Sequence, residues 1–271
     1  MPALRVMTFN IRGSSHSEDG VNAWDKRAQL NVETIGRANP DLIGFQELEK
    51  GNLETYQKWL PEYEYMLGPP TSNEEPCDCN AIFWKPSRLQ RVDSGHFWLS
   101  ETPEIASTGW EATTIRTAIW AKFRLVNNGR ELLLFNTHLE HIHKRARREG
   151  IGLILQRITQ MQGIGLPVIL TGDFNCNPDT YVHRLLLEGG FTDAYHATGH
   201  VDSEHTNTFH AYGWTKPSSS GAQREGSMRF DWILLQDKGL MHPLKCEIIR
   251  DAEPPIYPSD HYPVLAELEM L

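Results

Sequence analysis

The stretch TGDFNCNPD, residues 171–179, follows the apolar run LPVIL (166–170) and presents a carboxylate and a carboxamide two residues apart, Asp173 and Asn175. In an extended segment, side chains at i and i+2 point the same way, so the two are expected to face one spot past the end of a buried strand. A carboxylate beside an amide that both donates and accepts can hold a water molecule. The stretch alone is equally compatible with Asx-type turns made by the same two residues.

Residues of similar types stand at other predicted strand ends. They are Asn10 in TFN, Glu47 in FQE, His138 in NTHLE, Asp231 in FDWIL, and Asp260 and His261 in SDHYPV. Each alone could be a surface residue or a buried polar group with partners, but together they predict one acidic, histidine-bearing pocket at the sheet edges. Carboxylates crowded into such a pocket repel one another unless a cation neutralises them. Oxygen ligands with few usable thiols indicate Mg²⁺ or Mn²⁺ rather than zinc.

The elements that would carry these residues follow from hydrophobic periodicity. Strands are predicted at 4–9, 41–47, 81–85, 96–100, 117–126, 131–139, 168–170, 230–236, 244–249 and 263–270, and helices at 22–39, 51–60, 144–161 and 180–189. Helices alternate with strands early in the chain, whereas hairpins dominate its middle and end. This mixture predicts an α/β (mixed α+β) fold in which two mixed β-sheets pack face to face with helices outside. No repeat or clear linker divides the sequence, so a single domain is expected over residues 1–271.

Composition excludes some classes of protein. Of the 271 residues, 39% are hydrophobic and 23% charged, which is typical of a folded globular chain rather than a disordered one. The formal net charge of -9 argues against a protein that coats nucleic acid nonspecifically, although it leaves room for a local basic site.

The N-terminal segment MPALRVMTFNIRG lacks the long apolar stretch of a signal peptide, and no run approaches the roughly 20 apolar residues of a membrane span. We therefore expect a cytoplasmic protein without a membrane span, and no obligate protein partner is evident. The four cysteines, Cys77, Cys79, Cys176 and Cys246, are expected to be free thiols in that setting.

The motifs TFN, QE, THL, GDFN, D-x-I and SDH occur in this order from residue 8 to residue 261, across nearly the whole chain. Each is short, but their joint occurrence in this order is highly specific. The sequence resembles the endonuclease/exonuclease/phosphatase superfamily of metal-dependent phosphoesterases, which includes pancreatic-type DNases and inositol polyphosphate 5-phosphatases. The resemblance implies a four-layer α/β sandwich and hydrolysis of a phosphate ester.

The resemblance also implies roles for the acidic and amide residues. Asn10 and Glu47 look like the metal shell, with Asp260 nearby and Glu47 as the direct carboxylate ligand. Asp173 and Asn175 look like the pair that positions the attacking water.

Two histidines complete the implied site. His261 resembles the residue that contacts the scissile phosphate or acts as general base, and Asp231 its carboxylate partner, which sets tautomer and orientation. His138 resembles a second catalytic histidine that stabilises charge or protonates the leaving group. Members of the superfamily differ in the identity of the base, so the sequence leaves that assignment open.

Three further residues are predicted with alternatives. In DNase-like relatives an acidic residue before the third strand pairs with the equivalent of His138, and Asp78 in EEPCDCNAIF fits that place best. Arg116 matches a phosphate-facing arginine of relatives, or it forms an ordinary surface ion pair. His210 is a candidate substrate contact in the polar loop 198–227, where TFHAYGW, with Tyr212 and Trp214, would either stack on a substrate or pack under the loop.

The basic run HIHKRARR (141–148) allows two interpretations, a solvated helix face or a rim that steers anions. Because the chain is acidic overall, the substrate is predicted to be a small or single-stranded phosphate ester, with a duplex-DNA endonuclease as the alternative. An inactive scaffold that binds a phosphorylated partner is disfavoured, because every catalytic residue type is present. A two-carboxylate glycosidase would leave the histidines unexplained.

Overall fold

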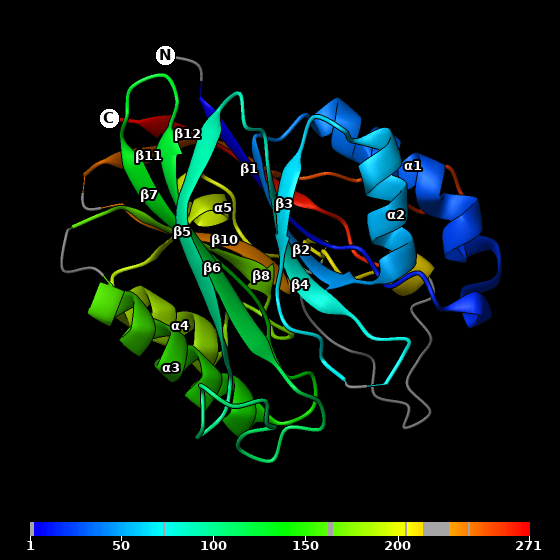
Figure 1. The fold of residues 1–271 in the computed structure, drawn as a ribbon, viewed down its shortest axis with the longest axis horizontal. Coiled ribbons are helices and arrows are strands. Elements are labelled where there is room, and N and C mark those ends of the chain that lie inside the picture. Colours follow the sequence, from blue (N-terminus) through cyan, green and yellow to red (C-terminus); the bar gives the residue numbers. More distant parts are fainter. Residues whose placement is uncertain (1–2, 73, 162–164, 204, 214–227, 238) are drawn as a thin grey trace.

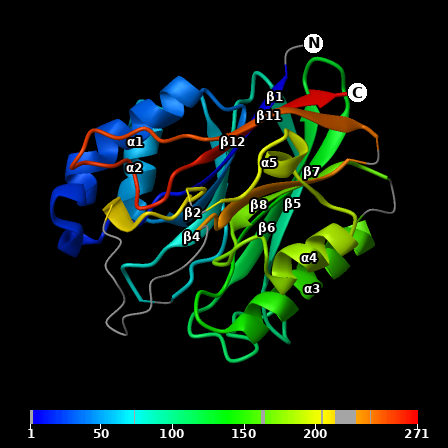
Figure 2. The same ribbon diagram turned by 180° about the vertical axis from the view of Figure 1, so that it is seen from behind.

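The computed structural model describes residues 3–271 except 73, 162–164, 204, 214–227 and 238. In this part of the chain, two six-stranded sheets pack against each other, and helices cover the outer face of each sheet (Figure 1; Figure 2). The layers are therefore helix, sheet, sheet and helix. This arrangement confirms the predicted four-layer α/β sandwich.

The first sheet contains the first and last strands of the chain. Its strands, in spatial order, are β11 (Met241–Ile248), β12 (Val264–Met270), β1 (Leu4–Asn10), β2 (Leu42–Leu48), β4 (Cys79–Trp84) and β3 (Glu64–Leu67). Helices α1 (Trp24–Ala38) and α2 (Lys50–Trp59) lie on its outer face (Figure 1). Apolar residues recur at helical spacing along α1, and three of them, Trp24, Ala28 and Ile35, are buried against this sheet. The helix ends before Pro40, and Asn39 caps it in a left-handed conformation.

The second sheet is built from the middle of the chain. Its strands, in spatial order, are β5 (Leu89–Trp98), β6 (Thr117–Leu125), β7 (Glu131–His138), β8 (Val168–Asp173), β10 (Asp231–Gln236) and β9 (Thr192–Asp193). Helices α3 (Lys144–Met161) and α4 (Tyr181–Glu188) cover its outer face (Figure 2). Between the two sheets, apolar side chains such as Val6 and Ile82 of the first meet Ile119 and Ile169 of the second. Burial of this apolar surface holds the sheets together.

Strand pairing in the second sheet brings three predicted residues side by side. β7 and β8 run parallel with His138 opposite Asp173, and β10 runs antiparallel to β8 with Asp231 opposite Asp173. Residues opposite each other in a ladder project to the same face, so the three side chains lie together. In the first sheet, β1 and β2 are parallel, and Asn10 and Glu47 stand near their carboxyl ends.

A buried polar bridge joins the sheets next to these strand ends. Nε2 of Gln46 on β2 donates to Oδ1 of Asn136 on β7 at 2.7 Å, and the hydroxyl of Thr171 on β8 donates to the same oxygen at 3.1 Å. A Cβ atom on Gly44 would lie 2.4 Å from the Thr171 hydroxyl oxygen, so only glycine allows this close approach. Because buried polar groups need partners, the bridge favours one relative position of the two sheets.

Several short elements escaped the sequence prediction. They are β3, β9, α5 (Ala194–Ala197) and two 3₁₀ turns, Ser17–Asn22 and Ala211–Gly213. β3 is mostly exposed and lacks an apolar alternation, while the others are too short to show a period. The strand predicted at 96–100 overlaps the last three residues of the longer β5, which ends at Trp98 and whose exposed middle gives no apolar alternation.

Two further expectations can be compared with the structure. The four cysteines are unpaired, as predicted. Among the helices in the described ranges, none has the length and apolar character needed to cross a membrane.

Candidate active site

A cavity of about 700 Å³ lies where the polar strand ends of the two sheets meet. The predicted residues on its lining are Glu47, Arg116, His138, Asp173, Asn175, Asp260 and His261. Asn10 and Asp231 are buried behind them and form hydrogen bonds to lining residues. A cavity of this size is in the range of about 300–1,000 Å³ that suits a small organic ligand.

His261 and Asp231 form a hydrogen-bonded pair that joins the two sheets. Nδ1 of His261, just before β12 of the first sheet, lies 2.8 Å from Oδ2 of Asp231, the first residue of β10 in the second sheet. Nε2 of His261 lies 3.7 Å from Oδ2 of Asp173. Burial opposes protonation of the ring, but Asp231 and Asp173 outweigh it and raise the pKa of His261 to about 10. The ring is therefore held as a cation beside two carboxylates.

His138 has the opposite electrostatic environment. Its Nε2 lies 3.4 Å from Oδ2 of Asp173. Burial and then the positive charge of Arg116 lower the pKa of His138 well below its ordinary value. Burial and then repulsion by Asp231 raise the pKa of Asp173 to about 7. The two histidines that flank Asp173 therefore carry different charges at neutral pH.

Asn10 connects the two carboxylates on either side of the sheet interface. Its Nδ2 donates to Oε1 of Glu47 at 2.9 Å and to Oδ2 of Asp173 at 3.0 Å, while its Oδ1 accepts from the backbone N–H of Arg12 at 3.1 Å. Glu47 itself has a positive φ of 58°, which is unusual for a residue with a side chain. Burial and then repulsion by Asp260 raise the pKa of Glu47.

Asp173 and Asn175 both line the cavity, but not for the reason that the sequence suggested. β8 ends at Asp173, and Asn175 has a left-handed φ of 50°, so the segment is not extended and the i, i+2 argument was wrong. The backbone N–H of Asn175 donates to Oδ1 of Asp173 at 2.8 Å, which is the Asx-type turn considered as the alternative. The Nδ2 of Asn175 donates to the carbonyl of Leu139 at 2.9 Å and anchors the turn.

The acidic residues of the cavity suit a divalent cation. Burial and repulsion by Asp260 raise the pKa of Glu47. Burial and repulsion by Asp231 raise the pKa of Asp173, and Oδ1 of Asp231 is buried without a hydrogen-bond partner in the described residues. The ligand atoms of Asp173, Asp231 and His261 also lie close enough together to hold a metal ion, although the charge of His261 already offsets part of the repulsion there. Such a cation would offset the repulsion, and a mainly carboxylate donor set is one that Mg²⁺ and Mn²⁺ accept.

Basic residues line another part of the cavity. Arg116 is 9% exposed, its Nε is buried without a partner in the described residues, and its Nη2 lies 3.4 Å from Nδ1 of His141. Arg147, in the basic run, is 7% exposed and donates to the carbonyl of Glu140 at 2.7 Å. Both arginines and His141 line the cavity, whereas Lys144, Arg145 and Arg148 are exposed. The basic run is therefore mostly a solvated surface. Among its lysine and arginines only Arg147 is buried, and it lines the cavity together with His141.

Asp78 lies near the catalytic groups but does not form the predicted pair. Asp78 lines an adjoining cavity of about 440 Å³ together with Glu47 and His138, and it accepts a hydrogen bond from Thr71. Within the described residues no hydrogen bond or ion pair joins it to His138, whose carboxylate neighbour is Asp173. The predicted Asp78–His138 pair is therefore not formed.

His210 packs inside the protein rather than on the cavity lining. Its ring lies 4.0 Å from the ring of Tyr262 and 5.0 Å from that of Tyr257, and both of its nitrogens are buried without partners in the described residues. Burial and His261 lower its pKa to about 4. The structure thus favours the packing interpretation over a substrate contact, and Trp214 lies outside the described residues.

Sequence reasoning missed two arginines that organise the site. Arg12 lines both cavities, and its guanidinium bonds Asp19 at 3.1 Å. Arg27 in α1 is fully buried. It donates to the carbonyl of Ile11, just after β1, and to that of Pro258, just before Asp260 and His261, at 2.9 Å each. The sequence signal that could have revealed Arg27 is its position three residues after Trp24, which places it on the apolar face of the predicted helix.

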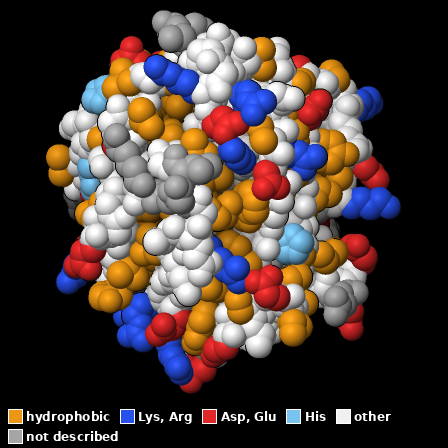
Figure 3. All heavy atoms as spheres, turned by 60° about the vertical axis from the view of Figure 1, so that its left-hand side comes forward, with side chains coloured by type: hydrophobic (Ala, Val, Ile, Leu, Met, Phe, Trp, Pro, Cys, Tyr) orange, Lys and Arg blue, Asp and Glu red, His pale blue; other side chains and the backbone are white. Residues whose placement is uncertain are grey.

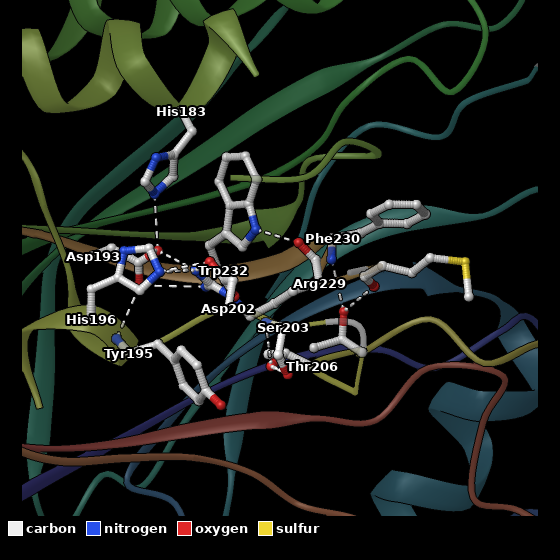
Figure 4. Close-up of polar contacts among 12 residues, drawn as sticks. His183, Asp193, Tyr195, His196, Asp202, Ser203, Thr206, Arg229, Phe230 and Trp232 are labelled. Atoms are coloured by element: carbon white, nitrogen blue, oxygen red, sulfur yellow. Dashed lines mark hydrogen bonds and ion pairs between the residues drawn. The ribbon is translucent and has the colours of Figure 1, made fainter. Parts of the chain in front are cut away.

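A second polar cluster lies beside the start of β10, and we name it the Arg229 cluster. It consists of Arg229, Asp193, Asp202, His183 and His196 (Figure 4). Asp193, Asp202 and His196 surround the guanidinium, with Nη2 of Arg229 at 2.7 Å from Oδ2 of Asp193 and 3.1 Å from Nε2 of His196. His183, Asp193 and His196 could otherwise hold a metal ion, but the arginine already supplies the positive charge. We therefore interpret this cluster as structural.

Arg229→Met is expected to lower the unfolding free energy by about 3–5 kcal/mol at pH 7, because it leaves two carboxylates without their buried cation. Burial opposes ionisation of Asp193, but His183 and Arg229 lower its pKa to about 2, and the pKa of Asp202 is lowered as well. Lowered carboxyl pKa values stabilise the fold above about pH 4, and this contribution is lost as the pH falls toward 2.

The loss caused by Arg229→Met should therefore be smaller at pH 3 than at pH 7, as measured by urea unfolding at both values. Arg130→Met, at an exposed arginine, is the control and should change neither curve. An equal loss at both pH values would contradict the electrostatic explanation.

Comparison with known proteins identifies the family of this chain. A sequence profile of the Endonuclease/Exonuclease/phosphatase family matches residues 7–261. Human nocturnin is 28% identical over 207 residues, covering 68% of this chain and 45% of its own length, so the chain spans less than half of that relative. An uncharacterized protein of Acanthamoeba polyphaga mimivirus is 27% identical over 180 residues, covering 64% of this chain and 67% of its own length.

Solved structures show the same fold. A family protein from Bacteroides vulgatus superposes with a TM-score of 0.87 at 27% identity, covering 100% of both chains. The mannosyl-6-phosphatase of Bacteroides thetaiotaomicron superposes with a TM-score of 0.85 at 27% identity, covering 99% of this chain and 100% of its own. With the family profile extending over nearly the whole sequence, this chain belongs to the endonuclease/exonuclease/phosphatase family.

Proposed function

We propose that this protein is a Mg²⁺- or Mn²⁺-dependent phosphoesterase that hydrolyses a small or single-stranded phosphate ester by attack of water. The observation that carries the proposal is the convergence on one cavity of two carboxylate-paired histidines and the acidic pair Glu47 and Asp260. Phosphate hydrolysis requires a positioned nucleophilic water and neutralisation of charge on the phosphoryl oxygens, and this set of residues suits both.

The proposed metal site consists of Glu47 and Asp260, with Asn10 holding Glu47 in place. When bound there, the ion supplies positive charge to the phosphoryl oxygens. Asp173, with Asn175 beside it, is proposed to hold the attacking water. A carboxylate whose pKa is raised to about 7 is well suited to accept a proton at neutral pH.

The two histidines are proposed to act on the phosphate and the leaving group. Because its pKa is raised to about 10, His261 is cationic and is better suited to contact a phosphoryl oxygen than to act as base. Asp231 accepts from Nδ1 and fixes the orientation of the ring. His138, with its pKa lowered, is neutral and suited to donate a hydrogen bond to developing charge on the leaving oxygen. Arg116 is proposed to bind a phosphate oxygen through the part of its guanidinium that faces the cavity.

The size and charge of the site support a small substrate. Arg12, Arg116 and Arg147 are the arginines on the described cavity lining, enough for one or two phosphates but not for a long backbone. One face of the molecule, drawn in Figure 3, carries interspersed acidic and basic side chains, so no basic track crosses that face. The similar Bacteroides thetaiotaomicron protein is itself named a mannosyl-6-phosphatase, which supports a compact phosphate ester over a duplex.

The proposal is tested by an activity screen of the purified protein with Mg²⁺ or Mn²⁺. The substrates are sugar phosphates, lipid phosphates, bis-p-nitrophenyl phosphate, short RNA and plasmid DNA, with His261→Ala as the inactive control. Turnover of a small or single-stranded ester that requires metal is the expected result. No hydrolysis of any of these substrates would refute the proposed function.

For the best substrate, KM is expected to depend weakly on salt. Each phosphate contact with B-DNA contributes a slope of roughly -0.9 to a log–log plot of affinity against salt concentration. We expect a slope equivalent to about one or two contacts, measured from 50 to 300 mM NaCl at fixed metal concentration. Efficient cleavage of plasmid DNA with a slope of about five or more contacts would favour the duplex endonuclease instead.

A further inference from the structure

The position of Asp231 depends on its backbone more than on its side chain. One carboxylate oxygen pairs with His261, and the other, Oδ1, is buried without a hydrogen-bond partner in the described residues. Asp231 is also the first residue of β10, where the strand ladder begins. Whatever fixes the backbone at this point therefore determines where the carboxylate meets the imidazole.

Thr208 contributes to that fixation, together with the β8–β10 ladder and the hydrogen bond from the N–H of Phe174 to the carbonyl of Phe230 at 2.8 Å. The side chain of Thr208 is fully buried, and its hydroxyl oxygen accepts from the backbone N–H of Phe230 at 2.9 Å and from that of Asp231 at 3.1 Å. The backbone carbonyl of Thr208 accepts from the N–H of Tyr262 at 2.7 Å, the residue that follows His261. Thr208 therefore bonds to the backbone beside both members of the pair. Asp231 begins a strand of the second sheet, and Tyr262 lies just before β12 of the first sheet.

The residues after Thr208 strengthen this connection. Phe209 forms an isolated antiparallel bridge with His261, and its ring lies 4.9 Å from the imidazole. The N–H groups of His210 and Ala211 both donate to the carbonyl of Asp260, at 2.9 and 3.1 Å. The segment 208–211 therefore follows the backbone on the His261 side. On the other side, the N–H groups of Thr208 and Phe209 donate to the carbonyl of Met228 at 3.1 Å each, and the Thr208 hydroxyl reaches the N–H of Asp231 itself.

We propose that Thr208 is a positioning residue that sets the geometry of the Asp231–His261 pair. This inference rests on the proposed function, because it assigns a role within the same site. The competing explanation is that Thr208 is only a buried threonine whose loss affects stability. Valine has nearly the same shape as threonine but cannot accept a hydrogen bond, so Thr208→Val separates the two explanations.

Thr208→Val is expected to lower kcat by about 10–100-fold, the range found when an outer partner that orients a functional group is removed, while KM changes by less than about threefold. Thr208→Ser keeps the acceptor and should recover most of the lost kcat. Thr206→Val is the matched control, because the Thr206 hydroxyl oxygen accepts from the backbone N–H of Ser203 at 3.0 Å (Figure 4). Among the described residues, no hydrogen bond joins this hydroxyl to Asp231 or His261.

A double-mutant cycle with Asp231→Asn distinguishes positioning from stability. If Thr208 acts through the pair, Thr208→Val should cost less than about threefold once Asp231 is replaced, because the group that it positions has already been disabled. A full 10–100-fold loss in the Asp231→Asn background would overturn the proposal. If Thr208→Val does not fold, Thr208→Cys, with a weaker acceptor, is carried through the same cycle.

Amide hydrogen exchange provides a readout that does not depend on activity. The N–H groups of Phe230 and Asp231 should exchange at least about tenfold faster in Thr208→Val, while that of Leu234, inside β10, stays unchanged. Faster exchange with unaltered kcat would show a purely structural role and overturn the proposal. If the unsubstituted protein hydrolyses no phosphate ester, the proposed function fails, whereas the exchange data still decide whether Thr208 holds this backbone.

Discussion

Glu47→Gln is expected to lower kcat/KM by about a thousandfold and to raise the Mg²⁺ concentration needed for half-maximal activity. A bound metal ion contributes several kcal/mol to transition-state stabilisation, and each 1.4 kcal/mol corresponds to about a factor of ten in rate. Glutamine keeps the shape and can keep the hydrogen bond from Asn10, but it lacks the charge that binds a cation. Initial rates across a Mg²⁺ titration measure both effects.

The controls separate loss of metal from loss of fold. Glu54→Gln, at an exposed position on α2, should behave like the unsubstituted protein. The circular dichroism spectrum of Glu47→Gln should be unchanged, and EDTA should abolish the activity of the unsubstituted protein until Mg²⁺ or Mn²⁺ is restored. A fully active Glu47→Gln protein in EDTA would rule out the proposed metal site.

His261→Ala and Asp231→Asn are each expected to reduce kcat by about 10²–10⁴-fold, the range for positioned acid–base groups. Removing the imidazole removes the cation that is proposed to face the phosphate. Asparagine at 231 loses the charge that raises the pKa of His261. Steady-state kinetics on the best substrate at saturating Mg²⁺ measure each loss.

The double variant tests whether the two residues act as one unit. Residues that work together show strongly non-additive losses, so the double variant should be little worse than the worse single variant. Losses that multiply would instead show that Asp231 and His261 act independently. Asp237→Asn, at a residue that follows β10, is a matched control and should leave kcat unchanged.

The order of layers and most of the regular elements were predictable because hydrophobic periodicity reports which face of a segment is buried. α3 was predicted with its observed bounds, Lys144–Met161, and β6 and β7 within one residue at their ends. β3 and β9 were not predicted, since an exposed four-residue strand and a two-residue strand carry no periodic signal. Their pairing depends on neighbours that are distant in the sequence.

For the site residues, the sequence by itself determined which side chains stand at strand ends. The type of a residue and the apolar run that precedes it are both local properties of the sequence. Asn10, Glu47, His138, Asp173 and Asp231 were found in this way. Partners were not determined, because they come from other strands and loops. His138 faces Asp173 instead of Asp78, and His210 packs on Tyr262 instead of lining the cavity.

Only the tertiary structure decided which charged and polar residues are buried. Arg27 and Arg229 were not singled out from the sequence, and Arg147 was left in a basic run with two interpretations. Each is buried: Arg27 among several backbone carbonyls, Arg229 between two carboxylates, and Arg147 against the carbonyl of Glu140. Thr208 is similarly unremarkable until two sheets place Asp231 and Tyr262 against it. The reason is physical: a polar group is stable inside a protein only if its hydrogen-bond partners surround it, and those partners are assembled by packing between segments far apart in the chain.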